Sequence, residues 1–253
     1  MRDVATRAEV CAAAISDNFR GDGEILVSCF GSVPSVGARL AKLTHAPDLL
    51  MTDGIASLVD GVQPVSGKRG APAIEAWMPF RSVFDLLWSG RRHVVMMASQ
   101  IDRFGNQNFS AVGPHAKPSA QLIGMRGAPG NTISHPTSYW VPNHSQQTFV
   151  ARVDVVCGVG YDRAAQLSPQ QRRFHEIRRV ISNLGVFDFA TPDRRMRLAS
   201  LHPGVNVDEV VKNTAFELAI PNDVPATRMP AAAELALMRE QIDPEGFANK
   251  EVR

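Results

Sequence analysis

Apolar and small residues recur at helical spacing near the start of the chain. The pattern runs over residues 7–19, directly after Thr6, and Glu9 stands three positions beyond that threonine. A threonine followed three residues later by a glutamate is typical of a capping box. Glycines at 21 and 23 then interrupt the pattern. A capped helix over residues 7–19 is therefore predicted.

The next apolar runs alternate with a glycine turn and a second helical pattern. Residues 25–30 form a continuous apolar run, which is typical of a strand buried on both faces. A helix is predicted at 36–43 and a short buried strand at 49–51. The order strand–helix–strand predicts a βαβ unit, and hence parallel strands joined by a right-handed crossover.

The alternation continues to the end of the chain. Further strands are predicted at 94–97, 122–125, 148–156, 180–181, 186–189 and 196–201, and further helices at 81–88, 207–213 and 231–242. The last three strands are expected to pack as hairpins, and the segments 61–73 and 164–173 read as loops, the second a polar surface insertion. We predict an α/β fold with an open, largely parallel sheet flanked by helices, in a single domain over residues 1–253.

Charge and composition exclude several classes of function. The net charge is only +2, so a nucleic-acid or membrane-surface partner is not expected. The arginine pairs at 91–92, 172–173 and 178–179 are short, and solvated faces or subunit contacts are expected for them. Three widely spaced cysteines, no secretory signal and no long apolar run indicate a cytoplasmic protein.

An acidic turn follows the predicted strand at 49–51. Asp53 and Gly54 come directly after it. In open α/β sheets, ligands are bound by the loops that leave the carboxyl ends of the strands. Asp53 is therefore a candidate site residue.

A second polar loop spans residues 100–108. Gly105 permits a tight turn with positive φ, and Asn106 and Asn108 can cap main-chain groups there. These asparagines are expected to support the loop rather than to contact a substrate.

A glycine-rich loop at residues 124–131 is the strongest candidate for direct chemistry. Gly124, Gly127 and Asn131 would bring main-chain N–H groups close to a ligand and toward a developing oxyanion. Arg126 lies between these glycines. Its guanidinium could hold a ketone oxygen or carboxylate with two directed hydrogen bonds.

Other chemistries lack their usual patterns. The seven histidines are scattered without metal-ligand spacing, so no metal is expected. The glycines at 124, 127 and 130 miss the dinucleotide fingerprint, so no cofactor is expected. No serine-hydrolase elbow occurs, so a serine hydrolase is not expected. His135 and His144 flank Tyr139 and Trp140 in what reads as a loop that could line a pocket.

These segments together resemble the β subunits of the family I coenzyme A transferases. The stretch 43–54, the loops at 100–108 and 124–131, and the segment 201–216 follow in the family's order. The family's covalent nucleophile is a glutamate in the turn after the strand, and the matching residue here is Asp53. Ordinary CoA transfer is therefore not expected.

Within that family, the chain resembles a branch from steroid-degrading bacteria that hydrolyses a carbon–carbon bond. The shared features include Thr-Asp-Gly in place of the glutamate turn, and the motifs at 77–80, 90–95, 125–127 and 182–188. This resemblance implies an α subunit of the same fold, with two α and two β chains, and a cyclic β-keto acyl-CoA as substrate, so that CoA belongs to the substrate.

The resemblance further implies that the α subunit carries the base, and Arg126 is then the catalytic candidate of this chain. Two alternatives stay open: a true transferase that uses Asp53, and a non-catalytic acyl-CoA-binding protein.

Overall fold

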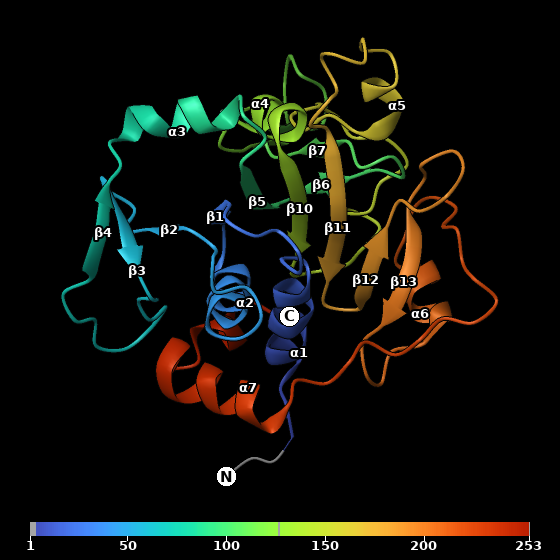
Figure 1. The fold of residues 1–253 in the computed structure, drawn as a ribbon. Coiled ribbons are helices and arrows are strands. Elements are labelled where there is room, and N and C mark those ends of the chain that lie inside the picture. Colours follow the sequence, from blue (N-terminus) through green and yellow to red (C-terminus); the bar gives the residue numbers. More distant parts are fainter. Residues whose placement is uncertain (1–3, 126, 253) are drawn as a thin grey trace. The chain divides into compact units, whose positions relative to one another are not determined.

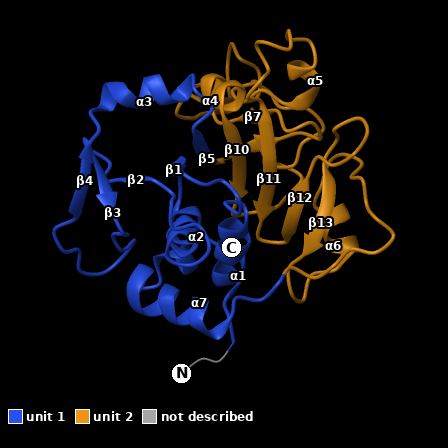
Figure 2. Cartoon of the chain, in the orientation of Figure 1, with its two compact units in different colours: residues 1–95, 228–253 blue, residues 96–227 orange. Residues whose placement is uncertain are grey.

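The computed structural model describes residues 4–125 and 127–252. By its internal contacts the chain forms two compact units, Met1–Val95 with Arg228–Arg253, and Met96–Thr227 (Figure 2). The division concerns internal contacts, and the single domain expected from the sequence remains a prediction.

The first unit opens with helix α1, Arg7–Asp17, and its predicted cap is confirmed. The Glu9 main-chain N–H donates to the Thr6 hydroxyl at 3.3 Å, and the Glu9 carboxylate accepts from the Thr6 N–H at 2.7 Å. Helix α2, Ser32–Leu43, packs against α1. A Cβ on Gly37 would lie 2.7 Å from the carbonyl oxygen of Ala12, so the close approach of the two helices requires glycine there.

The predicted βαβ unit is confirmed. Strand β1, Leu26–Cys29, precedes α2 and pairs in parallel with β5, Arg92–Met97. A parallel bridge also joins Leu26 to Leu50, just before β2. Helix α2 begins four residues earlier than predicted, because Pro34 fits the first turn of a helix, where its missing N–H is no loss.

A small antiparallel sheet follows. It is made of β2, Met51–Thr52, β3, Ser57–Asp60, and β4, Ala73–Trp77, in that order. Neither β3 nor β4 was predicted, because neither shows sustained alternation of apolar and polar residues. Helix α3, Phe80–Leu87, comes next and matches its prediction within one residue (Figure 1).

The C-terminal segment returns to this unit. Helix α7, Ala232–Leu237, continues as one π-helical turn, Met238–Ile242, so the predicted helix at 231–242 is confirmed with a change of winding. A 3₁₀ turn, Phe247–Lys250, follows.

In the second unit, four strands lie in the order β10, Pro136–Val141, β11, Glu176–Ser182, β12, Gly185–Asp188, and β13, Arg197–Leu201. The first pair is parallel and the other two are antiparallel, which confirms the predicted hairpins. The remaining elements are short: β6, Gln100–Ile101, β7, Gln107–Asn108, β8, Ala111–Val112, β9, Ala120–Gln121, α4, Ala128–Ser134, α5, Tyr161–Ala164, and α6, Val207–Lys212.

Two strand predictions are wrong, and the long central strand of this unit was not predicted. The segment 122–125 bends instead of pairing, and Ile123 and Met125 are exposed. The segment 148–156 makes one bridge, from Phe149 to Ile101, and then bends. The buried strand is β10, which contains Tyr139 and Trp140, so the pocket-lining loop expected there is also wrong.

The fold class is confirmed as α/β, with a mixed sheet of mostly parallel strands and flanking helices. In the described part of the chain, no helix is long and apolar enough to cross a bilayer.

Candidate functional site

The turn after β2 is organised by the carboxylate of Asp53. Its Oδ1 accepts hydrogen bonds from the main-chain N–H groups of Ile55, Ala56 and Ser57, at 2.8, 3.0 and 3.1 Å. Gly54 within the turn has φ of 81°, a conformation that glycine adopts without steric cost. Asp53 is thus the acceptor that closes this turn, as short acidic side chains often are.

The same hydrogen bonds change the acidity of the group. Donation by the Ile55 N–H, and next by that of Ser57, lowers the pKa of Asp53, because the donors stabilise the ionised form. A carboxylate held in this way is a weaker base, and one of its oxygens is already committed to the turn.

A cavity of about 470 Å³ lies beside this turn, within the first unit. Its walls come from the length of β1, from Arg92 at the start of β5, from α2, from the Asp53 turn and from the start of α3. The volume is in the usual range for small-molecule sites, and the cavity includes the turns after β1 and β2, at strand ends of the kind where α/β sheets bind ligands.

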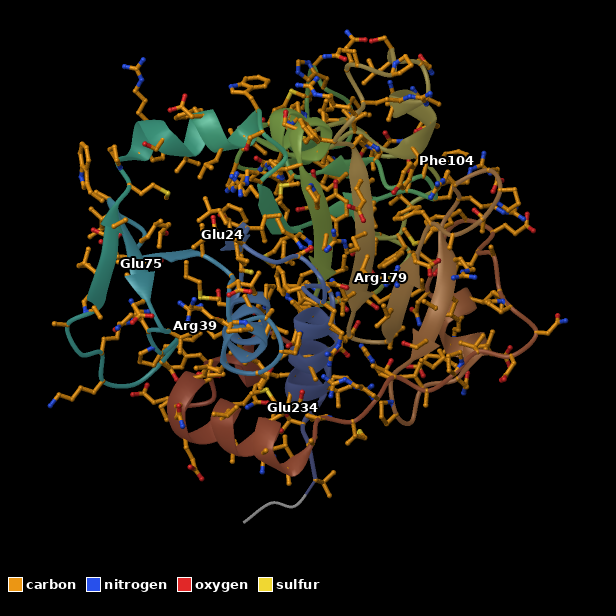
Figure 3. All side chains as sticks on the ribbon, in the orientation of Figure 1. Glu24, Arg39, Glu75, Phe104, Arg179 and Glu234 are labelled. Atoms are coloured by element: carbon orange, nitrogen blue, oxygen red, sulfur yellow. The ribbon has the colours of Figure 1, made fainter. Side chains whose placement is uncertain are left out.

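Two guanidinium groups and one thiol line the cavity. Arg39, labelled in Figure 3, donates to the carbonyl oxygens of Gln63 and Ser35, and the Nε of Arg92 donates to the Ser28 hydroxyl at 3.0 Å. Burial lowers the pKa of both arginines, and burial raises the pKa of the Cys29 thiol to about 12. At neutral pH the cavity therefore presents two guanidinium charges, the Asp53 carboxylate and a neutral thiol, a net positive setting suited to an anionic ligand.

These three residues were not selected from the sequence. Arg92 was expected at a solvated or subunit-contact face, but it is only 8% exposed at the start of β5, whereas the side chain of its neighbour Arg91 is exposed near Glu24. A polar residue at the end of a buried apolar run was the pattern that could have indicated Cys29 and Arg92.

In the second unit, the asparagines of the loop at 100–108 are buried. Asn106 donates through Nδ2 to Asp102 and to Asp162, and its Oδ1 accepts from the Gly160 N–H at 2.9 Å. Asn108 donates to the Gln100 side chain at 2.7 Å and to the Ala111 carbonyl oxygen at 2.8 Å. Both side chains therefore hold neighbouring segments together.

The glycine-rich segment is partly helical. Gly124 has φ of 85°, and Gly127 precedes α4, so Asn131 lies in the helix rather than in a loop. Asn131 is buried, and its main-chain N–H donates to the Gly127 carbonyl oxygen at 2.9 Å. Arg126 lies outside the described residues.

The second unit brings two of the predicted segments together. Thr132 of α4 accepts a hydrogen bond from the Val159 N–H at 3.0 Å, and the next residue, Gly160, binds Asn106. A Cβ on Gly160 would lie 2.5 Å from the Asn106 nitrogen. The asparagine loop and the helix after Gly127 therefore share one supporting segment, whereas Asp53 belongs to the other unit.

His144, one histidine of the predicted pair, is structural. His144 forms hydrogen bonds of 2.9 Å with Ser182 and with Thr214 and stacks on Phe149. Burial lowers its pKa to about 3, so it stays neutral. Across the described residues, no group of three or more histidine, cysteine, aspartate or glutamate side chains is arranged to hold a metal ion.

The strand-end turn, the adjoining cavity and the α/β order define the class of this protein. The chain belongs to the coenzyme A transferase family, whose model matches residues 83–213.

Two relatives and one crystal structure are similar to this chain over nearly its whole length. The cholesterol ring-cleaving hydrolase IpdB subunit of Rhodococcus jostii (strain RHA1) is 55% identical over 98% of this chain and 96% of that subunit. The subunit of the same name from Mycobacterium tuberculosis (strain H37Rv) is 53% identical over 99% of this chain and 100% of its own length. The crystal structure of R. jostii RHA1 IpdAB matches with a TM-score of 0.92 and 54% identity, over 98% of this chain and 99% of that one.

Proposed function

We propose that this chain is the β subunit of a two-subunit hydrolase that opens the last steroid ring of a cyclic β-keto acyl-CoA. The observation that carries the proposal is the identity of 53–55%, over nearly the whole length, with subunits named for cholesterol ring cleavage. Such identity greatly exceeds the 30% found with a 3-oxoadipate CoA-transferase subunit.

The proposed reaction is a retro-Claisen hydrolysis. Water, deprotonated by a base, adds to the ring ketone and forms a tetrahedral oxyanion. The bond between the former ketone carbon and the carbon next to the thioester then breaks, and its electron pair becomes an enolate of the thioester. A proton returns to that carbon, so that one water is consumed, the ring opens and a carboxylate forms.

The proposed roles follow from the two negative charges that develop in this reaction, on the tetrahedral oxyanion and on the thioester enolate. Arg126, with main-chain N–H groups of Gly124 and Gly127, would stabilise the oxyanion or the enolate, because directed donors act most strongly where charge develops. Asn131 would hold α4 behind this loop. We assign the base to an α subunit of the same fold, in an assembly of two α and two β chains.

The geometry of Asp53 favours this hydrolase over a transferase. Family transferases attack with a glutamate at this position, whereas here the shorter carboxylate closes its own turn with three main-chain donors. Displacement of a nucleophile by one methylene, about 1.5 Å, can cost about a hundredfold in rate. A covalent adduct on Asp53, trapped by hydroxylamine or borohydride, would support the transferase instead.

The proposal is tested with the co-expressed α and β chains and a cyclic β-keto acyl-CoA in ¹⁸O-labelled water. We expect a ring-opened acyl-CoA that carries one labelled oxygen in its new carboxylate and keeps its thioester. Free CoA, or CoA moved to an added carboxylic acid, would contradict the proposal. Absence of turnover with tight acyl-CoA binding would support a non-catalytic binding protein.

A further inference from the structure

The segment that leads into the glycine-rich loop presents two large apolar side chains to solvent. Ile123 is 67% exposed and Met125 is 43% exposed, on either side of Gly124. Burial alternates along residues 121–125, so both side chains are turned outward. We name residues 122–125 the 122–125 segment. Apolar side chains exposed beside a binding loop mark ligand grooves or protein contacts.

Both ends of the 122–125 segment are fixed by main-chain hydrogen bonds. The Leu122 N–H donates to the Ser110 carbonyl oxygen at 2.8 Å, next to the strand pair β8–β9. The Met125 carbonyl oxygen accepts from the Ala128 N–H at 3.1 Å, in the first turn of α4. The backbone therefore holds the exposed side chains in place beside the start of α4.

The backbone between the two side chains has room for a ligand. Gly124 has φ of 85°, and apart from its chain neighbours, a Cβ on it would meet no described atom within 4 Å. No described residue accepts a hydrogen bond from its main-chain N–H. A glycine with these two properties permits close approach of a carbonyl oxygen to the backbone.

The proposed chemistry decides what would lie beside these side chains. A donor that stabilises an oxyanion acts at about 2.7–3.1 Å from the oxygen. Consecutive Cα atoms are about 3.8 Å apart, so a carbonyl held by the Gly124 N–H is within reach of the side chains of Ile123 and Met125. In the proposed substrate, the ketone carbon and the carbon next to the thioester are both ring atoms. The group within reach is therefore an alicyclic ring.

We infer that Ile123 and Met125 determine specificity for an alicyclic acyl group by contacting its ring on both sides of Gly124, an inference that rests on the proposed function. The branched side chain of Ile123 is stiff at χ1 and gives a fixed wall, whereas the thioether of Met125 is flexible and adapts to an irregular ring. The phosphates and amides of a CoA tail are polar and do not match two aliphatic side chains.

The test measures how tightly the assembled α–β complex binds two acyl-CoA probes. Cyclohexanecarboxyl-CoA carries the ring, and acetyl-CoA carries a methyl group in its place. Neither probe has a ketone to which water can add, so neither undergoes retro-Claisen cleavage during the measurement. The ratio of the two dissociation constants, from calorimetry, separates the contribution of the ring from that of the CoA tail.

Two double variants are compared with the wild type. Ile123→Ala with Met125→Ala shortens the proposed ring contacts, and the matched control, Ile220→Ala with Met229→Ala, shortens exposed side chains of the same two types elsewhere. We expect the wild type and the control to bind cyclohexanecarboxyl-CoA on the order of 100-fold more tightly than acetyl-CoA. The 123/125 variant should lower this ratio at least about tenfold, because one methylene in an apolar contact is worth about 10–200-fold.

An unchanged ratio in the 123/125 variant would overturn the inference. Equal weakening of both probes would then assign the 122–125 segment to the CoA tail. Weaker association of the α and β chains with an unchanged ratio, measured by size-exclusion chromatography with light scattering, would assign it to a subunit contact. Melting curves of both variants report whether each is folded.

The two proposals fail separately, because the probes report binding of the ring and not its cleavage. If the 123/125 variant lowers the ratio but the wild-type complex does not hydrolyse a cyclic β-keto acyl-CoA, the proposed function is wrong and the ring contact stands. If the wild-type complex hydrolyses it and the 123/125 variant keeps the ratio, the ring contact is wrong and the function stands.

Discussion

Asp53 illustrates how one methylene changes a site. The transferase family places a glutamate here, and the extra carbon would carry its carboxylate beyond the turn. In this chain the shorter side chain reaches back instead and accepts three main-chain hydrogen bonds. An acidic residue is present at the strand end in both cases, but here its carboxylate accepts hydrogen bonds from the main chain of its own turn.

Asp53→Asn is expected to keep the turn, because the amide oxygen replaces Oδ1 as acceptor, and to keep hydrolysis within about tenfold of wild type, since water rather than a protein carboxylate attacks. Asp53→Ala should keep most of the activity with a looser turn. Steady-state kinetics of the α–β complex measure both. Loss of turnover in the folded Asn variant would give Asp53 a chemical role.

A second prediction at the level of single residues concerns Arg126, which lies outside the described residues. Arg126→Ala should lower kcat by about 10²–10³ if the guanidinium stabilises developing charge. Arg126→Lys should rescue poorly, because an ammonium lacks the planar two-point fork. A loss confined to KM would instead mean uniform binding of a CoA phosphate, and an unchanged kcat would end the catalytic assignment.

His144 should make folding depend on pH. Its pKa is about 3 in the folded chain and near 6.5 when unfolded, so the unfolded chain binds the extra proton between these values. Stability is therefore full above about pH 6.5 and falls by up to about 1.4 kcal/mol per pH unit as the pH drops toward 3. Urea unfolding at pH 7 and 5 should show a smaller difference for His144→Gln, with the exposed His115→Gln as control. Equal pH slopes in both variants would contradict this.

At the scale of elements, the N-terminus of α2 is capped from the far end of the chain. Glu251 accepts a hydrogen bond from the Val33 N–H at 2.8 Å, and its carboxylate lies against Gly31, where φ is 108°. Carboxylates are favoured at helix N-termini, where free N–H groups and the helix dipole meet them. The C-terminal residues thus stabilise the first crossover helix.

Gly31→Ala tests this contact. Its new Cβ would displace Glu251, so the variant should lose the cap, about 1 kcal/mol, in addition to the cost of a positive φ, about 1 kcal/mol. Gly21→Ala is the matched control, because φ there is also positive and nothing lies within 4 Å of the new Cβ. Chemical denaturation measures both. Equal losses would show that the Glu251 contact adds nothing, and Glu251→Ala should remove the difference.

At the scale of the whole molecule, the chain is expected to be inactive alone. The cavity offers positive charge and apolar walls within one unit, and the proposed base is on the α subunit. Titration of this chain with the α chain should raise turnover from background to a plateau at equal numbers of the two chains. Full turnover by the isolated β chain would contradict the two-subunit assignment.

Local pattern was sufficient for the elements that depend on nearby residues. The capping box at Thr6, the βαβ unit and the late hairpins were predicted because each depends on side chains within a few residues or on one continuous apolar run. The misplaced strand at 148–156 and the missed β10 have the opposite cause. Both segments are apolar, and only tertiary pairing decides which of them enters the sheet.

The sequence by itself determined the α/β class, the family resemblance and the identity of the acid after β2. Tertiary structure decided that the carboxylate of Asp53 accepts hydrogen bonds from its own turn, and that Arg92 is buried and lines the same cavity as Cys29. It also decided that the aromatic side chains of α3, Phe80 and Phe84, face solvent instead of a core. The reason is that local pattern fixes which face of an element is apolar, whereas the chain's other elements determine what that face meets.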